Sequence, residues 1–501
     1  MIRLIPGAPG VRPLQLGAAG LQPLASSEAR ALVLTDEATL PAVAWENKST
    51  RVSAPANVTR LSPSPRMAAG LPPALRVYRA EAQDLPAGES YVIRASAGAS
   101  TAAVDFRTVP DEIPNEGLTV AVASCFYDGF AMDAAYLATL RQSNVWFGEP
   151  AFKLLIGDNL YLDVAKSAAQ YSDGYQETAA HYARYFWRTD YADVLSYLPT
   201  LTTWDDHEFW NNYPESQPWL ARSRGNMRID YHRAGHEGID LFQAPLNPPG
   251  VAPGLPAPRS YAFNVGFLSF FVADTRTQRT LNGAHAPRFM PTPELEALEA
   301  WAAGLQGPGV LVVGQPLWLG TGSWTDFNLT DFTEQYRRLW AALSTAPYDV
   351  LVVSGDVHHS RWIQFGLPGQ RSIYEFVTSP ASCIPTIGSV ITGSYKTQDS
   401  GEVNFPAQVP LDRARANPRY SRYLFGAGPK APNSIGLLHF VPGPQKSVSV
   451  GGAFLNVATK ALAASEDATI KDGLFHSRKE QGSYSTNGLC QTQPRVRLGK
   501  R

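Results

Sequence analysis

The sequence reads Phe-Lys-Leu-Leu-Ile-Gly-Asp-Asn-Leu-Tyr at 152–161, where an apolar run ends abruptly at Gly157 and Asp158. Four further short strings follow apolar runs in the same way: Ala-Ser-Cys-Phe at 123–126, Asp-Asp-His-Glu at 205–208, Ala-Asp-Thr-Arg at 273–276 and Ser-Gly-Asp-Val-His at 354–358. Near-continuous apolar runs are typical of buried strands. In open α/β sheets, ligands bind beyond the carboxyl ends of such strands. The series therefore predicts an α/β domain with a polar site at its strand ends.

The remaining sequence divides around this series. Residues 31–109 contain short β-rich runs separated by Pro, Gly and Asn, which predicts a small β-sandwich. The turn-rich stretch 110–117 follows, and beyond it strand candidates alternate with helix candidates. The predicted helices are 131–143, 176–195 and one after Pro291 whose apolar face contains Leu295, Leu298, Ala302 and Leu305. We predict a β-sandwich over 1–113, an α/β domain over 114–479 and a solvated C-terminal tail over 480–501.

Composition and charge exclude several functional classes. The chain has 501 residues, of which 44% are apolar, and a formal net charge of −1, so no basic field attracts nucleic acid and no nucleic-acid partner is predicted. No apolar run is long enough to form a transmembrane segment. The start of the chain lacks the apolar core of a secretory signal, which predicts a soluble cytoplasmic protein, or a periplasmic or secreted one if a leader was removed. Three cysteines are too few for a disulfide framework.

Asp158 is the strongest candidate metal ligand, because a carboxylate at a strand end can bridge two cations. Taken alone, a Gly-Asp pair after a strand is more often a turn. Tyr161 follows three residues later, and Cys125 stands at another strand end. A lone buried cysteine commonly serves packing, but a coordinated thiolate has a lowered pKa and binds metal. A thiolate and a phenolate together favour ferric iron over a purely hard cation, provided that Cys125 and Tyr161 meet in space.

Two further strings supply candidate ligands and a candidate acid. Asp206 can bind a metal while His207 acts as a general acid, a task that suits imidazole near neutral pH. The same string is also compatible with the charged first turn of a helix. Asp356 and His358 are two positions apart, so both side chains point the same way if the loop is extended.

Three weaker candidates complete the site. Arg276 can bind phosphate oxygens through its planar guanidinium, and it is equally compatible with an ion pair to Asp274 or to a loop carboxylate. Gln315 follows another strand and is a candidate neutral contact to metal or substrate. Asn211 and Asn212 are candidates for orienting the loop after His207.

Together these strings resemble the alkaline phosphatase D (PhoD-like) family of calcineurin-like metallophosphoesterases, over residues 118–382 and the preceding β-sandwich. The resemblance implies an α/β metallophosphoesterase-like core of layered sheets and helices with an N-terminal fibronectin type III-like β-sandwich. In place of the superfamily's usual opening Asp-x-His string, this chain has Ser124 and Cys125, as the PhoD-like group does. The family's Gly-Asp-x-x-Tyr string matches Asp158 and Tyr161.

The same resemblance implies two metal sites. The family's metal-binding Asn and catalytic His match Asp206 and His207, and Asp356 replaces the first His of its Gly-His-x-His string. The implied ferric (Fe3+) ligands are Cys125, Asp158, Tyr161 and His358. The implied calcium (Ca2+) ligands are Asp158, Asp206 and Asp356. Zinc (Zn2+) and manganese (Mn2+) are the alternative metals.

These observations predict a hydrolase, namely an alkaline phosphatase D-like metallophosphoesterase acting on a phosphate ester substrate. In the predicted mechanism, a metal-bound hydroxide attacks a phosphate monoester or diester while His207 protonates the departing alcohol and Arg276 stabilises phosphate oxygens. One alternative is a phosphodiesterase of the phospholipase D type. An alternative of another class is a noncatalytic metal-stabilised binding protein. The preference for monoesters or diesters, the physiological substrate and the oligomeric state stay open.

Overall fold

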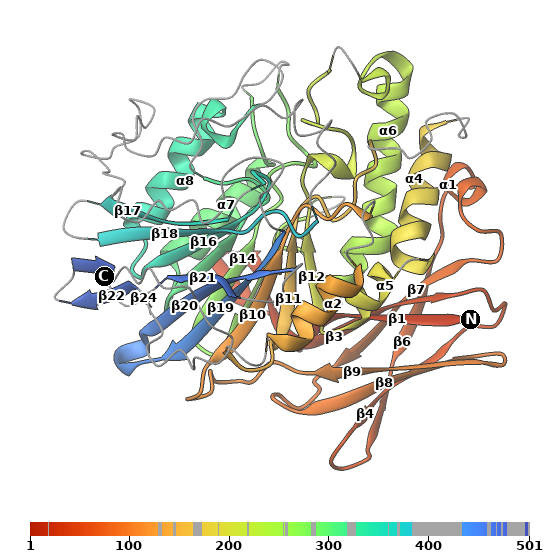
Figure 1. Cartoon of the computed structure of the whole chain (residues 1–501), viewed down its shortest axis with the longest axis horizontal. Coiled ribbons are helices and arrows are strands. Elements are labelled where there is room, and N and C mark those ends of the chain that lie inside the picture. The colour runs from red at the N-terminus through yellow and green to blue at the C-terminus, as the bar shows by residue number, and fades with distance from the viewer. Residues whose placement is uncertain are drawn as a thin grey trace.

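The protein was analysed as a computed structural model, in which most of the chain is described. The described residues are 1–18, 20–128, 133–143, 147–163, 173–188, 190–217, 220–253, 255, 259–281, 287–317, 327–358, 360–367, 371–382, 433–457, 462–466, 468–471, 474–477 and 496–498. Figure 1 shows the arrangement of the elements, with the N-terminal strands at one end of the molecule and the helix-covered sheets beside them.

The N-terminal region forms two antiparallel sheets that pack against each other. One sheet has the order β5-β4-β8-β9 and contains β4 (Ala42–Asn47), β5 (Ser53–Pro55), β8 (Ser90–Ala97) and β9 (Ser100–Arg107). The facing strands are β1 (Ile2–Gly17), β3 (Glu28–Thr35), β6 (Asn57–Leu61) and β7 (Arg76–Gln83). Buried and exposed positions alternate along β8, as expected of a strand with one buried face. A hydrophobic cluster that includes Val33, Tyr78, Trp45 and Ile93 joins the two sheets.

Strand β1 connects this region to the rest of the chain. Its first half pairs with β3, and Arg12–Leu14 pair with β13 (Tyr261–Val265). The same eleven-stranded sheet therefore runs from the N-terminal strands into the α/β part, in the order β17-β18-β16-β15-β14-β13-β1-β3-β7-β6, with β2 (Gly20–Pro23) paired to β1. The boundary near residue 113 stays a prediction.

The α/β part is built on two sheets that face each other. The eleven-stranded sheet contributes β14 (Leu268–Val272), β15 (Gly309–Val312), β16 (Val350–Ser354), β17 (Arg361–Leu367) and β18 (Arg371–Val377). The seven-stranded sheet has the order β12-β11-β10-β19-β20-β21 and contains β10 (Leu118–Ala123), β11 (Phe152–Ile156), β12 (Thr200–Thr203), β19 (Ser434–Pro442), β20 (Val448–Asn456), β21 (Leu462–Glu466) and β24 (Val496–Leu498). A cluster between them includes Val122, Leu154, Phe270, Val312 and Val353.

Helices cover the outer face of each sheet (Figure 1). On the seven-stranded sheet these are α2 (Asp133–Gln142), α4 (Gly174–Ala183) and α5 (Tyr191–Ser196), with α1 (Pro65–Gly70) and α6 (Gly225–Gly238) beyond them. On the eleven-stranded sheet these are α7 (Thr292–Ala303) and α8 (Thr333–Thr345). The predicted apolar face of α7 is confirmed, since Leu295, Leu298, Ala302 and Leu305 are buried. Burial on both faces explains the continuous apolar sequence of strands such as β16.

One helix prediction was wrong. The continuous helix expected over 176–195 is divided into α4, a π-helical segment at Arg184–Arg188, and α5. The π-helical segment buries three consecutive aromatic side chains, Tyr185, Phe186 and Trp187, in the core. In the predicted tail, Val496–Leu498 pairs with β20, and the rest of 480–501 lies outside the described residues.

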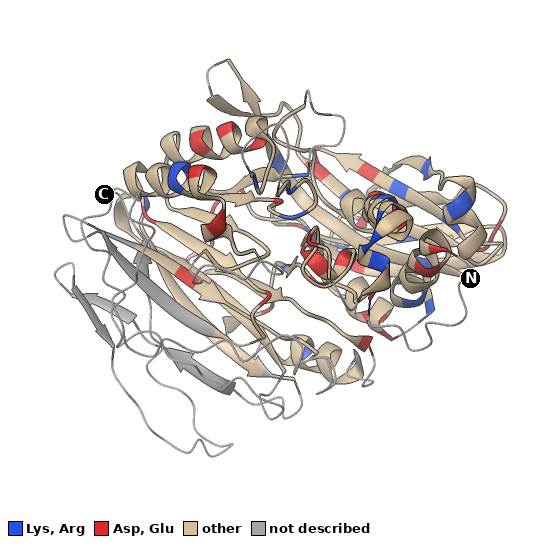
Figure 2. Cartoon of the chain, turned by 90° about the horizontal axis from the view of Figure 1, so that it is seen from above, with Lys and Arg blue, Asp and Glu red and all other residues tan. Residues whose placement is uncertain are grey.

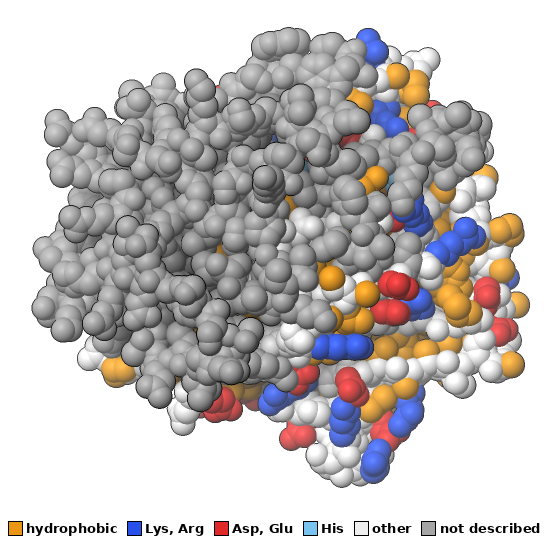
Figure 3. Space-filling view, viewed as in Figure 1, with side chains coloured by type: hydrophobic (Ala, Val, Ile, Leu, Met, Phe, Trp, Pro, Cys, Tyr) orange, Lys and Arg blue, Asp and Glu red, His pale blue; other side chains and the backbone are white. Residues whose placement is uncertain are grey.

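Charged side chains of both signs are mixed over the described surface. Figure 2 shows Lys and Arg interspersed with Asp and Glu along the elements, and Figure 3 shows the same mixture on the described part of one face. Within the described part of the chain, no helix has the length and apolar character needed to cross a membrane.

Candidate metal centre

The carboxyl ends of parallel strands bring the predicted ligands together. β10, β11 and β12 are parallel neighbours in one sheet, and β14, β15 and β16 are parallel neighbours in the other. Each of these strands ends within three residues of one of the polar strings or of Gln315. The loops meet at one edge of the paired sheets, which is where open α/β sheets bind ligands.

A first group of ligand atoms surrounds Asp158. Ligand atoms of Cys125, Asp158 and His358 all lie within 4.8 Å of one another. The phenol oxygen of Tyr161 lies 3.2 Å from Nε2 of His358 and 3.5 Å from Oδ2 of Asp158. Sγ of Cys125 lies 3.4 Å from the same Oδ2. Cys125 and Tyr161 therefore do meet around Asp158, as the iron prediction requires.

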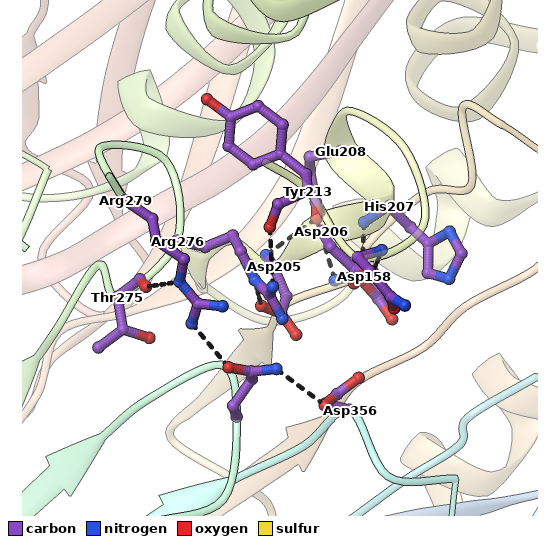
Figure 4. Close-up of polar contacts among 12 residues, drawn as sticks. Asp158, Asp205, Asp206, His207, Glu208, Tyr213, Thr275, Arg276, Arg279 and Asp356 are labelled. Carbon is purple, nitrogen blue, oxygen red and sulfur yellow. Dashed lines mark hydrogen bonds and ion pairs between the residues drawn. The ribbon is translucent and has the colours of Figure 1, made fainter. Parts of the chain in front are cut away.

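A second group overlaps the first through Asp158 (Figure 4). Ligand atoms of Asp158, Asp206 and His207 lie within 4.8 Å of one another, as do those of Asp205, Asp206 and Asp356. All six predicted metal ligands thus lie in two adjoining groups. Asp205, which the sequence did not single out as a ligand, belongs to the second group.

The backbone at these residues is unusual. Four of the candidate ligands have positive φ angles: Cys125 at 56°, Asp158 at 52°, Asp356 at 66° and His358 at 53°. Non-glycine residues adopt this region rarely, at about 1–2 kcal/mol each, and such residues cluster at functional sites. The loop at Asp356 and His358 is therefore not extended, which was the condition for both side chains to point the same way. The left-handed turns send His358 to the first group and Asp356 to the second.

Two glycines allow the loops to approach each other closely. A Cβ at Gly157, which has a φ of 97°, would lie 2.7 Å from Cβ of Asp205. A Cβ at Gly355 would lie 2.6 Å from the Ser124 side chain. Both distances are too short for real carbon contacts, so the packing of the loops requires glycine before Asp158 and before Asp356, and at Gly157 the positive φ requires it as well.

Glu208 joins two of the loops and was not identified as a site residue from the sequence. Its buried carboxylate accepts backbone N–H groups from Asp158 at 3.1 Å, Asn159 at 2.8 Å and Asp205 at 3.0 Å. One side chain therefore holds the loop after β11 against the loop after β12. The available signal was its position in Asp-Asp-His-Glu, but acidic residues there are also typical of a first helical turn.

His207 has a carboxylate partner that the sequence did not reveal. Nδ1 of His207 lies 2.7 Å from Oδ1 of Asp163, and the His207 backbone N–H donates to Oδ1 of Asp158 at 3.2 Å. The imidazole lies over the ring of Tyr161, with 4.1 Å between ring centroids. The backbone N–H of Asn211 donates to Oδ2 of Asp163 at 2.8 Å. This loop residue therefore acts through its main chain.

The electrostatics of the group favour a bound cation. Burial raises the pKa of Asp158 well above its ordinary value, and nearby Asp206 and Asp205 add to the rise. Burial, with the adjacent Asp158 and Asp356, likewise raises the pKa of the Cys125 thiol. A coordinated cation reverses this balance because it stabilises thiolate and carboxylate directly. These groups are therefore arranged as they would be around a positive charge.

Two buried carboxylate oxygens without hydrogen-bond partners in the described part of the chain indicate whether the residues fit a metal. Oδ1 of Asp206 and Oδ2 of Asp205 are buried and have no hydrogen-bond partner among the described residues. Unpaired buried carboxylate oxygens are strongly unfavourable unless a cation or donor satisfies them. The donor set of carboxylate, thiol, phenol and imidazole matches metal ligation, so the residues fit the predicted metals as a class.

Arg276 is engaged in a buried ion pair. Its Nε donates to Oδ1 of Asp205, and Nη1 donates to the carbonyl of Tyr213 at 2.8 Å. Both charged side chains are only 1% exposed. This geometry favours the ion pair with a loop carboxylate over a free phosphate clamp, the two alternatives that the sequence left open.

Gln315 lies between Arg279 and a candidate ligand. Nη2 of Arg279 donates to Oε1 of Gln315 at 2.7 Å, and Nε2 of Gln315 donates to Oδ2 of Asp356 at 3.4 Å. Gln315 therefore contacts a candidate metal ligand as well as Arg279. Arg279 was missed in the sequence because an arginine three residues after Arg276 carries no pattern of its own.

The comparisons with known proteins bear on the fold. No family model and no curated protein matches the sequence. Among solved structures, one described as the structure of PhoD matches with a TM-score of 0.57 over 94% of this chain and 92% of that chain. The chain has a PhoD-like fold. Sequence identity to that structure is 16%, so the PhoD-like fold establishes architecture, and the function must be argued from the site.

Proposed function

We propose that this protein is a metal-dependent phosphoesterase. The observation that carries the proposal is the pair of adjoining ligand groups that share Asp158, with His207 beside them, at the strand ends of a PhoD-like fold. Two cations held a few ångströms apart suit in-line displacement at phosphorus. The finer fold assignment, a metallophosphoesterase core with a fibronectin type III-like sandwich, belongs to the same proposal.

The two groups differ in chemistry, which supports different metals. Cys125, Asp158, Tyr161 and His358 would hold ferric iron, because a set that joins thiolate and phenolate to carboxylate and imidazole favours ferric iron over a purely hard cation such as magnesium. Asp158, Asp206 and Asp356 would hold calcium, which prefers carboxylate oxygens. Zinc or manganese in place of these metals would preserve the reaction class. When bound, the metals would lower the pKa of water and neutralise charge on the phosphate.

The chain supplies the acid for the leaving group. Although burial alone would raise it, the pKa of Asp163 is held below its ordinary value by His207. An ionised carboxylate only accepts hydrogen bonds, so Nδ1 of His207 carries a proton toward Asp163. Nε2 is then the atom available to hold and deliver a proton to the departing alcohol. Tyr161 supports the imidazole ring from one side.

Arg276 has a different proposed role from the one suggested by the sequence alone. Its ion pair with Asp205 leaves Asp206 as the neighbouring carboxylate for the metal. Asp206 is suited to this task, because the positive charges of His207 and Arg276 outweigh burial and hold its pKa below the ordinary value. Any contribution to binding phosphate oxygens would be made from this paired position.

Metal analysis of the purified protein, together with its visible spectrum and a substrate panel, tests the proposal. We expect two metals per chain, a thiolate or phenolate charge-transfer band, and hydrolysis of an aryl phosphate or its bis-aryl diester. Preferential hydrolysis of a phospholipid diester would favour the phospholipase D-type alternative. A fully metallated protein that hydrolyses none of these esters would contradict the proposal and favour a noncatalytic metal-stabilised binding protein.

A further inference from the structure

Three successive strand-end loops are connected by one chain of buried side chains. Arg279 lies in the loop after β14, Gln315 in the loop after β15, and Asp356 in the loop after β16. Figure 4 shows the connection from Thr275 through Arg279 and the intervening amide to Asp356. Arg279 and Gln315 are 4% and 1% exposed. A buried arginine outside both ligand groups is therefore connected to a candidate ligand through one amide.

The orientation of the amide follows from the donors available. A guanidinium can only donate hydrogen bonds, so the Gln315 oxygen must face Arg279. Nε2 must then face Asp356 and donate to it. Arg279 is held independently, because Nε donates to the Thr275 carbonyl at 3.2 Å and Nη1 to the Phe327 carbonyl at 3.0 Å. The direction of the hydrogen bond to Asp356 is thus set from outside the metal centre.

We propose that Arg279, acting through Gln315, is a positioning residue for the cation held by Asp206 and Asp356. This inference rests on the proposed function for the assignment of Asp356 as a ligand. The amide donates to Oδ2 and so restricts rotation of a carboxylate whose backbone is already constrained at a positive φ. Partners of this kind orient ligands, and their loss typically lowers metal affinity by about 10- to 100-fold.

The geometry distinguishes positioning from simple stabilisation. The bond from Gln315 to Asp356 is long, at 3.4 Å, so its loss should cost the fold little stability. The first ligand group contains neither Asp356 nor Gln315. Removal of the amide should therefore weaken binding of the cation held by Asp206 and Asp356 and leave the other cation bound.

Two variants of Gln315 remove the hydrogen bond to Asp356 in different ways. Gln315→Met has a similar volume but neither accepts from Arg279 nor donates to Asp356. Gln315→Glu still accepts from Arg279 but directs a carboxylate oxygen at Asp356. Gln335→Met is a matched control, since Gln335 is also a buried amide but bonds only to the backbone of Phe289 and Met290 in the described contacts.

The experiment measures metal stoichiometry and the dissociation constant of each cation by titration of metal-depleted wild type and variants with calcium and iron salts. We expect both Gln315 variants to retain the first cation and its visible band while the second binds about 10- to 100-fold more weakly. Excess metal should restore occupancy. Gln335→Met should alter thermal stability without altering either dissociation constant.

Three results would overturn the inference: wild-type affinity for both cations in Gln315→Met, equal loss of both cations with a lowered melting temperature, or a wild type that binds no second cation. The dissociation constants are measured without substrate. A wild type that binds both metals but hydrolyses no ester would therefore contradict the proposed function. The role of Gln315 would still be decided by the dissociation constants of the two cations.

Discussion

His207 and Asp163 form a buried pair in which Nδ1 of the imidazole lies 2.7 Å from Oδ1 of the carboxylate. The two residues come from different loops, after β12 and after β11, and the backbone N–H of Asn211 fixes the other carboxylate oxygen. The pair therefore determines which ring nitrogen of His207 faces the metal centre and which is held by the protein.

Replacement of His207 by Gln should lower kcat by about 10²–10⁴-fold while both metals stay bound. Because a general acid matters most when the leaving alcohol is a poor leaving group, the loss should be larger for an alkyl phosphate than for 4-nitrophenyl phosphate. Steady-state kinetics on both esters, with metal analysis of the same samples, checks this. Loss of a metal in His207→Gln would instead identify the imidazole as a ligand.

Asp163→Asn should lower kcat by part of the amount that His207→Gln lowers it. Combined with His207→Gln, it should cause no further loss of kcat. Residues that act as one unit show non-additive effects, so the double variant should be no slower than His207→Gln alone. The comparison of kcat among the two single variants and the double variant measures this coupling. Additive losses would show that Asp163 acts independently of His207.

Cys125→Ser and Tyr161→Phe should alter the visible spectrum in different ways. Both side chains approach Oδ2 of Asp158, at 3.4 Å and 3.5 Å, so each is placed to ligate the same cation. If that cation is ferric iron, each variant should remove its own charge-transfer contribution. Absorption spectra with iron analysis provide the test, and a colourless wild type containing only zinc or manganese would exclude iron.

Arg276→Met should destabilise the fold by about 3–5 kcal/mol, because it leaves the buried carboxylate of Asp205 without its partner. Neutralising that carboxylate as well, in Arg276→Met/Asp205→Asn, should recover much of the loss. Urea unfolding of the wild type and both variants measures these differences. A phosphate clamp would give another result: an increased KM with little change in the free energy of unfolding.

Acid should destabilise the protein through His236 on α6. Burial, together with Arg259 and His232, lowers its pKa from 6.5 to about 3, so the unfolded chain takes up this proton at a higher pH than the folded chain does. The contribution to stability is complete above pH 6.5 and is lost as pH falls toward 3, by about 1.4 kcal/mol per unit.

The free energy of unfolding of His236→Gln, measured from neutral pH to about pH 5, provides the check on this titration. The free energy of unfolding of the variant should change less with pH than that of the wild type, because the variant lacks the titration of His236. Parallel curves for the two proteins would show that the imidazole at 236 takes no part in acid denaturation. His236 lies on α6, outside both ligand groups, so its replacement should leave the metal content unchanged.

Much of the fold was predictable because its signals are local. The apolar run at Phe152–Ile156 is buried on both faces, and the following Gly157 has the positive φ that a tight strand-end turn requires. The helix at Thr292–Ala303 was predictable for the same reason, since its apolar positions repeat with the helical period. The predicted helix over 176–195 was wrong because a π-helical segment at Arg184–Arg188 interrupts it, and the apolar period of the sequence does not reveal such a segment.

The sequence by itself determined which residues stand at the strand ends, because strand formation and turn chemistry depend on neighbours in the chain. The family resemblance implied how those residues divide between two ligand groups, but only the tertiary structure revealed the side chains that hold the loops together. The contacts of Asp163 with His207, of Glu208 with Asp158, and of Gln315 with Asp356 each join separate loops. Such contacts depend on left-handed turns and on which strands lie side by side in a sheet, which no local pattern specifies.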